Sequence, residues 1–570
     1  EGKDMQKRWV LKPKKNVDKI NKLQQELRVN PIIIELLINR KIETYEEAKE
    51  FFRPSLEHLH DPFLMKDMDK AINRIEKAIG NKEKILIYGD YDVDGTTAVS
   101  VVYSFFRDFN SGLEFYIPDR YSEGYGISNQ GIDYAAENGF SLIIALDCGI
   151  KAIDKIEYAN SKGIDFIIGD HHLPGQKLPN AIAVLDPKRS DCPYPYKELS
   201  GCGIGFKIIQ AFIKQNEMQM ELAYQYLDLV AVSIASDIVP ITGENRTLTY
   251  FGLKKLNSNP CWGLKALINL STHKAEQFTI NDIVFQIGPR INAAGRIKHA
   301  KDAVKLLISK SLPEATEYSE SVDVQNNERK DFDLKITQEA LELLDNNVQL
   351  QKQKTTVLYK KDWHKGVIGI VASRLTERYY RPTIILTNTN GHIAGSARSV
   401  VGFDLYEALS ECSDLLDQYG GHKYAAGLTM QLENINLFQM RFEEVVSRSI
   451  KPEMLQQEVA IEKEIRLVEI NADFYKLLRQ FQPHGPENES PTFLAKQVTM
   501  GYNANVVGGT HLKFSVKQSD SPKFDCIGFG LGEYCEDINT GKPFDICFSI
   551  GENTWRGKKN LQLIVKAIRF

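Results

Sequence analysis

The chain has 570 residues, which is more than one hydrophobic core usually supports, so about three or four domains are expected. Its 42% hydrophobic and 26% charged residues exclude a wholly disordered protein. No apolar run reaches the roughly 18 residues of a membrane span. The start, EGKDMQKRWV, is charged and lacks the apolar core of a signal peptide. We therefore expect a cytoplasmic protein without a membrane partner.

The net charge of −4 neither supports nor excludes nucleic acid as a partner, because acidic surfaces can offset a basic channel. Eight cysteines are scattered without a CxxC pair. In a long chain that needs no covalent staples, this pattern indicates reduced thiols.

Between residues 84 and 187, short apolar runs alternate with longer amphipathic segments. The runs are KILIYG, LEFYI, SLIIAL, DFIIG and AIAVLD. Runs rich in Ile, Leu and Val without polar alternation are typical of parallel strands that are buried on both faces. The pattern predicts a doubly wound α/β sheet, in which ligands bind beyond the carboxyl ends of the strands.

Acidic residues and histidines follow three of these predicted strands. They are Asp90, Asp92 and Asp94 after the first run, Asp147 after SLIIAL, and Asp170, His171 and His172 after DFIIG. Crowded carboxylates are unfavourable unless a cation neutralises them, and oxygen ligands with imidazole suit Mn²⁺ or Mg²⁺. Asp237 ends a predicted helix, where an isolated Asp is more often a helix cap. An EF-hand loop is excluded, since Val101 replaces its final Glu.

In order and spacing, these four segments resemble the motifs of the DHH phosphoesterase superfamily. The resemblance implies two divalent ions, Mn²⁺ or Mg²⁺, and a site lined by Asp90. It assigns the metal ligands to Asp92, Asp94, Asp147, His171 and Asp237. It also implies that His172 contacts the scissile phosphate and that Asp170 orients the neighbouring histidine.

Two further segments resemble the RecJ branch of this superfamily. LSGCGIGFK ends at Lys207, where close backbone approach and a cation would suit a phosphate, although a glycine-rich helix start is an equal alternative. GPRINAAGR contains Arg290, Asn292 and Arg296. Its two arginines are candidates for phosphate clamps or for pairs with acidic side chains. A polar segment with helical periodicity follows and predicts a long connecting helix.

A second α/β segment resembles the DHHA1 substrate-binding domain, through WHKGVIGIVASR, GSARS and GGH. The resemblance implies that Ser396 and Arg398 lie near the terminal phosphate of the substrate. Arg398 is the preferred anchor, because a guanidinium binds phosphate through two hydrogen bonds. His364 and His422 are candidates for substrate contacts or for structural roles.

The final strand-like runs resemble the OB-type domain that RecJ enzymes use to bind single strands. OB domains combine a basic groove with stacking aromatic rings. Trp555, Arg556 and Lys558 are the candidate contacts, and a solvated surface is the alternative.

We therefore predict an α/β protein with four parts. These are a doubly wound parallel-sheet DHH catalytic domain with an N-terminal helical segment (residues 1–300), a long connecting helix (301–350), a DHHA1 domain (351–452), and a connector with an OB-like β-barrel (453–570).

The resemblance to RecJ implies a metal-dependent exonuclease that releases mononucleotides from the 5′ end of single-stranded DNA in repair and recombination. It implies a monomer, with single-strand-binding protein and a helicase as candidate partners. One alternative is a DHH nuclease that acts on RNA or short oligonucleotides. The other is a non-catalytic Cdc45-like scaffold, in which eroded metal ligands would be expected.

Overall fold

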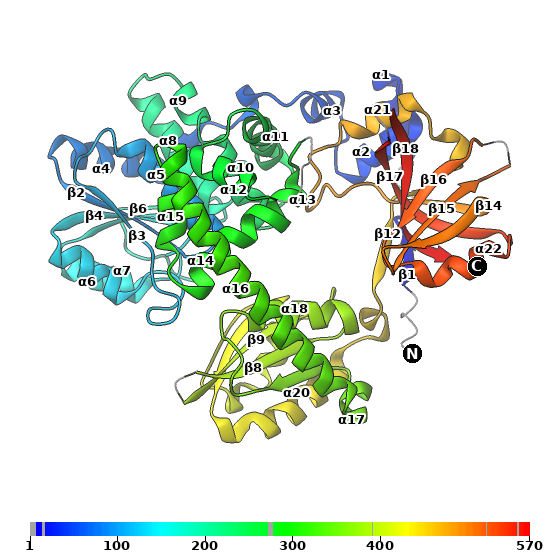
Figure 1. The fold of residues 1–570 in the computed structure, drawn as a ribbon. Helices are drawn as coiled ribbons and strands as arrows, with labels where there is room; N and C mark the ends of the chain where they lie inside the picture. The colour runs from blue at the N-terminus through cyan, green and yellow to red at the C-terminus, as the bar shows by residue number, and fades with distance from the viewer. Residues whose placement is uncertain (1–6, 14–16, 272–276, 390, 520, 556–557) are drawn as a thin grey trace. The chain divides into compact units, whose positions relative to one another are not determined.

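The computed structural model describes residues 7–13, 17–271, 277–389, 391–519, 521–555 and 558–570 (Figure 1). It contains two compact units. The first unit comprises Glu46–Glu328 and Phe481–Ser490, and the second comprises Glu1–Tyr45, Arg329–Gln480 and Pro491–Phe570.

A five-stranded sheet forms the centre of the first unit, in the order β3-β2-β4-β5-β6, and all of its pairings are parallel. The strands are β2 (Lys84–Gly89), β3 (Leu113–Tyr116), β4 (Phe140–Leu146), β5 (Asp165–Gly169) and β6 (Ala183–Leu185). Each of them falls within one of the five predicted runs, or extends it by one residue. The predicted parallel sheet is therefore confirmed.

Helices cover both faces of this sheet (Figure 1). Alternate strand residues point to opposite sides, so each face buries its own set of side chains. Ile85 and Ile87 belong to one buried cluster, and Leu86 and Tyr88 belong to another. The first face packs against α4 (Met68–Gly80), α5 (Val93–Phe106) and α8 (Gly201–Gln215), and the second against α6 (Asn129–Glu137) and α7 (Ile153–Ser161). This double cover explains why the strands read as continuous apolar runs.

Further helices follow α8 in this unit. They are α9 (Glu221–Tyr224), α10 (Leu227–Ser236), α11 (Gly243–Ser258), α12 (Trp262–Asn269), α13 (Ile280–Asp282), α14 (Gly288–Ile297) and α15 (Lys301–Leu307). Helices α10 and α11 pack closely at Gly252. A methyl group there would lie 2.5 Å from Cβ of Ala231 and even nearer the carbonyl oxygen of Leu227.

Helix α16 (Leu312–Asp345) confirms that a long connecting helix is present, although it is shorter than the expected range of 301–350, and at 34 residues it is about 50 Å long. Its later part is attached to the rest of the second unit by partly buried polar contacts. Asp333 accepts a hydrogen bond of 2.7 Å from Arg374, and Glu339 accepts one of 2.8 Å from the indole of Trp363.

The second unit contains a five-stranded mixed sheet in the order β10-β11-β9-β8-β7. Only the β7–β8 pairing is parallel. The strands are β7 (Thr356–Tyr359), β8 (Thr383–Thr389), β9 (His392–Arg398), β10 (Gln418–His422) and β11 (Ala425–Met430), with helices α17 (Val348–Lys352), α18 (Ile368–Tyr379), α19 (Leu405–Ser410) and α20 (Ile435–Ser449).

The remaining strands form a β module near the end of the chain. Pairings run from β14 through β15, β16, β18 and β17 and return to β14, as expected for an OB-like arrangement. The strands are β13 (Lys463–Glu464), β14 (Phe493–Val507), β15 (His511–Lys517), β16 (Phe524–Gly528), β17 (Phe544–Trp555) and β18 (Lys558–Arg569). At the other end of the chain, β1 (Arg8–Leu11) pairs in parallel with β12 (Glu458–Ile461). Helices α1 (Val17–Leu27), α2 (Pro31–Asn39), α3 (Tyr45–Phe52), α21 (Ala472–Arg479) and α22 (Cys535–Asn539) complete the chain.

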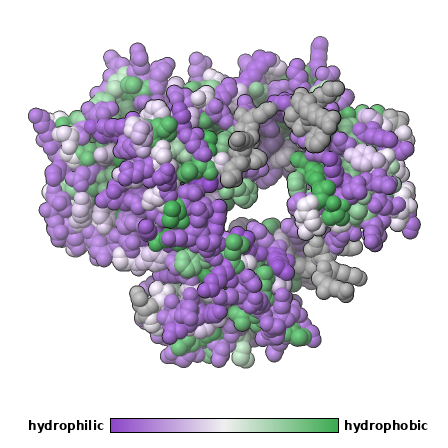
Figure 2. All heavy atoms as spheres, viewed as in Figure 1, coloured by the Kyte–Doolittle hydropathy of each residue, from purple (hydrophilic) through white to green (hydrophobic). Residues whose placement is uncertain are grey.

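Among the described helices, none has both the length and the apolar character needed to cross a bilayer. The face shown in Figure 2 is mostly hydrophilic, and its hydrophobic areas are small and separate.

The contact between α10 and α11 gives a test of the packing. We expect Gly252→Ala to lower the free energy of unfolding by about 2 kcal/mol, because the added methyl group forces the helices apart. Gly80→Ala at the end of α4 is the control, since nothing lies within 4 Å of its added methyl group. Urea unfolding followed by circular dichroism measures both, and equal midpoints for the two variants would contradict the close helix contact.

Candidate metal centre

The acidic residues that follow the parallel strands meet at the carboxyl edge of the sheet. Asp90 follows β2, Asp147 follows β4 and Asp170 follows β5. Asp92 is the N-cap of α5 and accepts a hydrogen bond from the backbone of its first turn, whereas Asp237 caps the end of α10. Asp147 has a left-handed backbone, with a φ of 60°.

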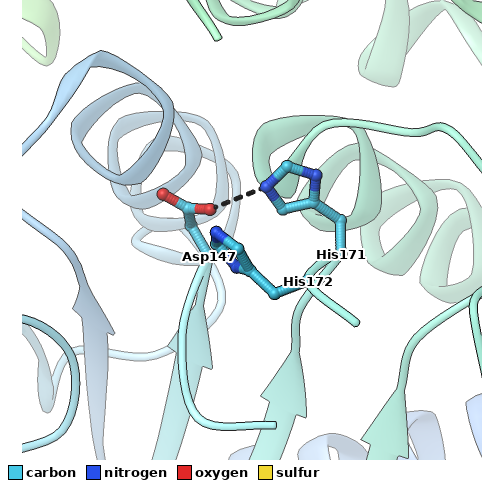
Figure 3. Close-up of side chains that lie close together, drawn as sticks. All are labelled: Asp147, His171 and His172. Atoms are coloured by element: carbon cyan, nitrogen blue, oxygen red, sulfur yellow. Dashed lines mark ion pairs between the residues drawn. The ribbon is translucent and has the colours of Figure 1, made fainter. Parts of the chain in front are cut away.

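His171 lies at the centre of this group. Its Nε2 atom is 3.2 Å from Asp147 Oδ1, and 3.5 Å from both Asp94 Oδ2 and Asp237 Oδ2. Figure 3 shows His171 and His172, which follow β5, directed toward Asp147 at the end of the neighbouring strand β4. Two sets of three residues each contain three potential ligand atoms that lie within 4.8 Å of one another. One set is Asp147, His171 and His172, and the other is Asp94, His171 and Asp237. His171 belongs to both sets, so together they outline one candidate cation centre around its ring.

The start of α8 holds the carboxylate of Asp94. The backbone N–H groups of Gly201 and Cys202 donate hydrogen bonds to it at 2.6 and 2.8 Å, and the Ser233 hydroxyl donates another at 2.7 Å. Gly201 also permits close approach, since a methyl group there would lie 2.6 Å from Cβ of Asp147. The glycine-rich segment is therefore a helix start, the alternative given for it, and its first N–H groups hold a candidate metal ligand and not a phosphate.

Asp170 contacts the ring of the second histidine. Its Oδ1 atom lies 2.7 Å from His172 Nδ1, and its Oδ2 atom accepts a hydrogen bond from the Ile150 backbone. Burial alone would raise the pKa of Asp170, but the hydrogen bond and charge of His172 lower it to about 2. Burial likewise opposes protonation of His172, yet Asp170 raises its pKa to about 9. At neutral pH this pair presents a protonated imidazole.

The other carboxylates carry more negative charge than the protein alone stabilises. Burial, followed by the charges of Asp94 and Asp92, raises the pKa of Asp147 well above its usual value. Burial and Asp94 raise the pKa of Asp237 to about 8. Burial and Asp92 also raise the pKa of Asp90. A bound cation would reverse these shifts, because it favours the ionised carboxylates.

Unpaired buried atoms show that the residues fit a metal ion. Within the described part of the chain, Asp90 Oδ2, Asp147 Oδ1 and both ring nitrogens of His171 are buried without a hydrogen-bond partner. Burial lowers the pKa of His171 and so favours the neutral ring that a ligand requires. Carboxylate oxygens with one imidazole suit Mn²⁺ or Mg²⁺.

Lys207 does not reach this centre. Its side chain is fully buried, and its Nζ atom donates hydrogen bonds to Glu244 Oε1 at 2.6 Å and to the His60 carbonyl at 3.0 Å. The Tyr194 hydroxyl completes the network by donating to Glu244 Oε2 at 2.6 Å. Lys207 therefore has a structural role, which corrects the expectation of a substrate contact.

The candidate substrate-binding residues Arg290, Asn292 and Arg296 all lie on α14. Arg290 donates from Nε to Asp323 at 2.7 Å, so the ion-pair alternative describes its contacts. Asn292 and Arg296 are half-buried on the same helix. The Tyr121 hydroxyl donates a hydrogen bond to the Arg296 carbonyl. Asn292 and Arg296 therefore stay candidates for substrate binding.

In the second unit, Ser396 and Arg398 lie together beside the start of α18. Arg398 Nη1 donates to the Ser396 hydroxyl at 3.1 Å. A methyl group on Gly369, the second residue of α18, would lie 2.9 Å from Ser396 Oγ and 3.1 Å from Arg398 Nη2. His364 stacks on Phe332, with ring centroids 4.8 Å apart.

The other candidate substrate contacts of this unit are His422, Trp555, Arg556 and Lys558. His422 is exposed, and its Nδ1 atom accepts a hydrogen bond of 3.3 Å from the Tyr424 backbone. The side chains of Trp555 and Lys558, and the whole of Arg556, lie outside the described residues.

The sequence reasoning missed Arg120. Its guanidinium lies 4.2 Å from the centre of the Tyr91 ring, and its charge opposes the rise in the pKa of Asp90 and Asp92. In the sequence, Arg120 is a single arginine in the loop after β3, and it belongs to none of the motifs described above.

Three family sequence models match consecutive parts of the chain. They are the DHH family N-terminal domain at residues 84–234, the DHHA1 domain at 352–448 and the RecJ OB domain at 461–567. The first match contains every predicted ligand except Asp237.

Whole-chain similarities agree with these matches. A single-stranded-DNA-specific exonuclease RecJ from Bacillus subtilis (strain 168) is 37% identical, over 98% of this chain and 70% of that relative. The protein of the same name from Escherichia coli (strain K12) is 30% identical, over 99% of both chains. The crystal structure of RecJ in complex with Mn²⁺ from Thermus thermophilus has a TM-score of 0.84 and 26% identity, over 99% of this chain and 79% of that one.

The structural role of Lys207 can be tested by Lys207→Met. We expect the free energy of unfolding to fall by about 3 kcal/mol, because the change leaves the Glu244 carboxylate buried without its cation. Lys214→Met on the same helix is the control, since its pair with Asp61 is solvent-exposed and contributes at most about 1 kcal/mol. Chemical denaturation measures both. A folded, equally stable Lys207→Met protein with weakened DNA binding would support the original substrate assignment.

Proposed function

The chain belongs to the RecJ family, and on that premise we propose that it hydrolyses single-stranded DNA from the 5′ end and releases mononucleotides. The observation that carries the proposal is the convergence of the predicted ligand residues on His171. A non-catalytic scaffold would not need this set, and here it is complete. Action on RNA or short oligonucleotides is the alternative that substrate tests decide.

We propose that Asp92, Asp94, Asp147, His171 and Asp237 hold the divalent ions, with Asp90 beside them. When bound, a pair of such ions activates water and stabilises the leaving oxygen during in-line displacement. The contribution of the protein is to fix the ligands before substrate arrives. The hydrogen bonds from α8 to Asp94 are one such constraint.

His172 is proposed to contact the scissile phosphate. Its ring is about half exposed, and Asp170 holds its proton. A protonated imidazole there donates a charge-assisted hydrogen bond to an anionic phosphate oxygen, and this bond strengthens as negative charge develops.

Arg398 and Ser396 are proposed to bind the 5′-terminal phosphate. Two observations support this: the guanidinium lies beside the serine hydroxyl, and Gly369 lets both side chains approach the start of α18. Helix N-termini also favour anions. This cluster supplies a fork of donors together with partial positive charge.

The partner proteins, the cellular location and the oligomeric state are also proposals. Single-strand-binding protein and a helicase are proposed partners, because an enzyme that takes single strands depends on others to open and present them. A cytoplasmic monomer is likewise proposed.

End-labelled oligonucleotides test the reaction. With Mn²⁺, we expect a 5′ label to be released as a mononucleotide before a 3′ label, and excess EDTA should abolish release. Asp147→Asn should lower the rate by more than about 100-fold while single-strand binding persists, because it removes a ligand charge without changing side-chain size. Asp154→Asn, at an exposed position of α7, is the control. Earlier release of the 3′ label, or full turnover in EDTA, would contradict the proposal, and equal rates on RNA would favour the alternative.

The proposed phosphate anchor is tested by Arg398→Lys, which keeps the charge but loses the planar fork. We expect KM for 5′-phosphorylated single strands to rise about tenfold, with little change in kcat, because one charge-assisted hydrogen bond is worth roughly 1.5 to 3 kcal/mol. Strands with a 5′-hydroxyl should show no such change. Arg378→Ala, at the exposed end of α18, is the control. If Arg398→Lys raises KM equally for 5′-phosphorylated and 5′-hydroxyl single strands, Arg398 does not bind the terminal phosphate.

A further inference from the structure

A cavity lies in the first unit, among the ends of helices α5, α10, α11, α12 and α15. Its volume is about 450 Å³, which lies in the range of about 300 to 1,000 Å³ that is usual for small-molecule sites. The lining includes Arg107, Lys255, Lys310, Tyr226, Trp262 and Ser309. None of the predicted site residues lines it.

The lining of this cavity is cationic. Arg107, Lys255 and Lys310 all face it, and no Asp or Glu is among its described lining residues. Arg107 donates from one nitrogen to the Ile308 carbonyl at 3.1 Å, and Lys255 donates to the Asn259 carbonyl at 2.8 Å. These bonds fix the direction of both side chains and leave further donors on each.

One carboxyl group lies close to these cations. Asp228 is fully buried, and its Oδ2 atom lies 3.8 Å from Lys255 Nζ and accepts a hydrogen bond from the Cys261 backbone. Because Asp228 is buried below the surface, it orients Lys255 without placing a negative group in the cavity.

An aromatic ring stands at the edge of the cavity. Trp262 begins α12, and 41% of its surface is exposed. Lys265 lies 5.1 Å from the centre of its ring, which supports the orientation of the indole. A flat apolar ring beside converging cations suits a ligand that has both an aromatic part and an anionic part.

Acidic residues beside the cavity limit the size of the ligand. An adjoining hollow of about 350 Å³ shares Arg107 and Lys310 but is also lined by Asp108 and Glu314. A long polyanion that continued through this hollow would meet like charges. The arrangement therefore favours a small anion over a nucleic-acid strand.

The cavity is separate from the metal centre. Helix α5 starts at the N-cap Asp92 in that centre and ends at Phe106, next to Arg107. Its 14 residues span about 20 Å. A ligand of nucleotide size in the cavity therefore does not contact the metal ligands.

We propose that this cavity is a non-catalytic binding site for a nucleoside 5′-phosphate, with the phosphate on Arg107, Lys255 and Lys310 and the base against Trp262. The proposal goes beyond the nuclease reaction and does not depend on it. It gives the enzyme a means of sensing free nucleotides, the class of molecule that its proposed reaction releases.

Quenching of tryptophan fluorescence by dAMP tests the site on the full chain. We expect saturable quenching in wild type with excess EDTA present, so that the signal does not depend on metal ions bound at the metal centre. Trp262→Phe should remove the saturable signal, which separates it from the other three tryptophans. Lys310→Ala should weaken binding about tenfold, the equivalent of about 1.4 kcal/mol.

Lys254→Ala is the matched control, because Lys254 precedes Lys255 on α11 but lies over the Tyr250 ring, outside the cavity. It should bind dAMP as wild type does. The proposal is overturned if dAMP causes no saturable quenching, if Lys310→Ala and Lys254→Ala bind equally, or if deoxyadenosine binds as tightly as dAMP. Displacement of dAMP by an aspartate-rich peptide at lower concentration than by phosphate would instead identify a site for acidic protein segments.

Discussion

The hydrogen bonds between the start of α8 and the Asp94 carboxylate are the constraint on which the rest of the metal centre depends. They join a helix that covers the sheet to a candidate ligand from the first turn of α5, and Ser233 adds a contact from α10. Because these elements also form the main core, the positions of the ligands are set by the packing of the whole unit. The positive end of α8 offsets part of the carboxylate repulsion before any ion binds.

The sequence indicated that the candidate ligands would lie close together, because parallel strands bring their carboxyl ends to one edge. Asp90, Asp147 and His171 could be placed by that rule alone. Lys207 could not, because its partner Glu244 lies 37 residues away and only tertiary packing brings the two together. Arg120 was missed for a similar reason, since the Tyr91 ring that it covers belongs to a different loop.

The glycine-rich start of α8 shows the limit of motif reasoning more clearly. Glycine near a helix N-terminus indicates close approach of an anion, but it does not say which anion. Here the anion is the Asp94 side chain, and the close neighbour of Gly201 is Asp147. In the second unit, the same kind of signal at Gly369 lies next to the Arg398 guanidinium.

The left-handed backbone of Asp147 places stability and catalysis in conflict. A residue with a side chain is strained in this conformation by roughly 1 to 2 kcal/mol, although Asp tolerates it better than most, whereas glycine adopts it freely. Glycine would also remove a buried carboxylate from a crowded group of negative charges. Directed evolution that selects only for heat resistance would therefore tend to replace this proposed metal ligand, unless activity is selected in parallel.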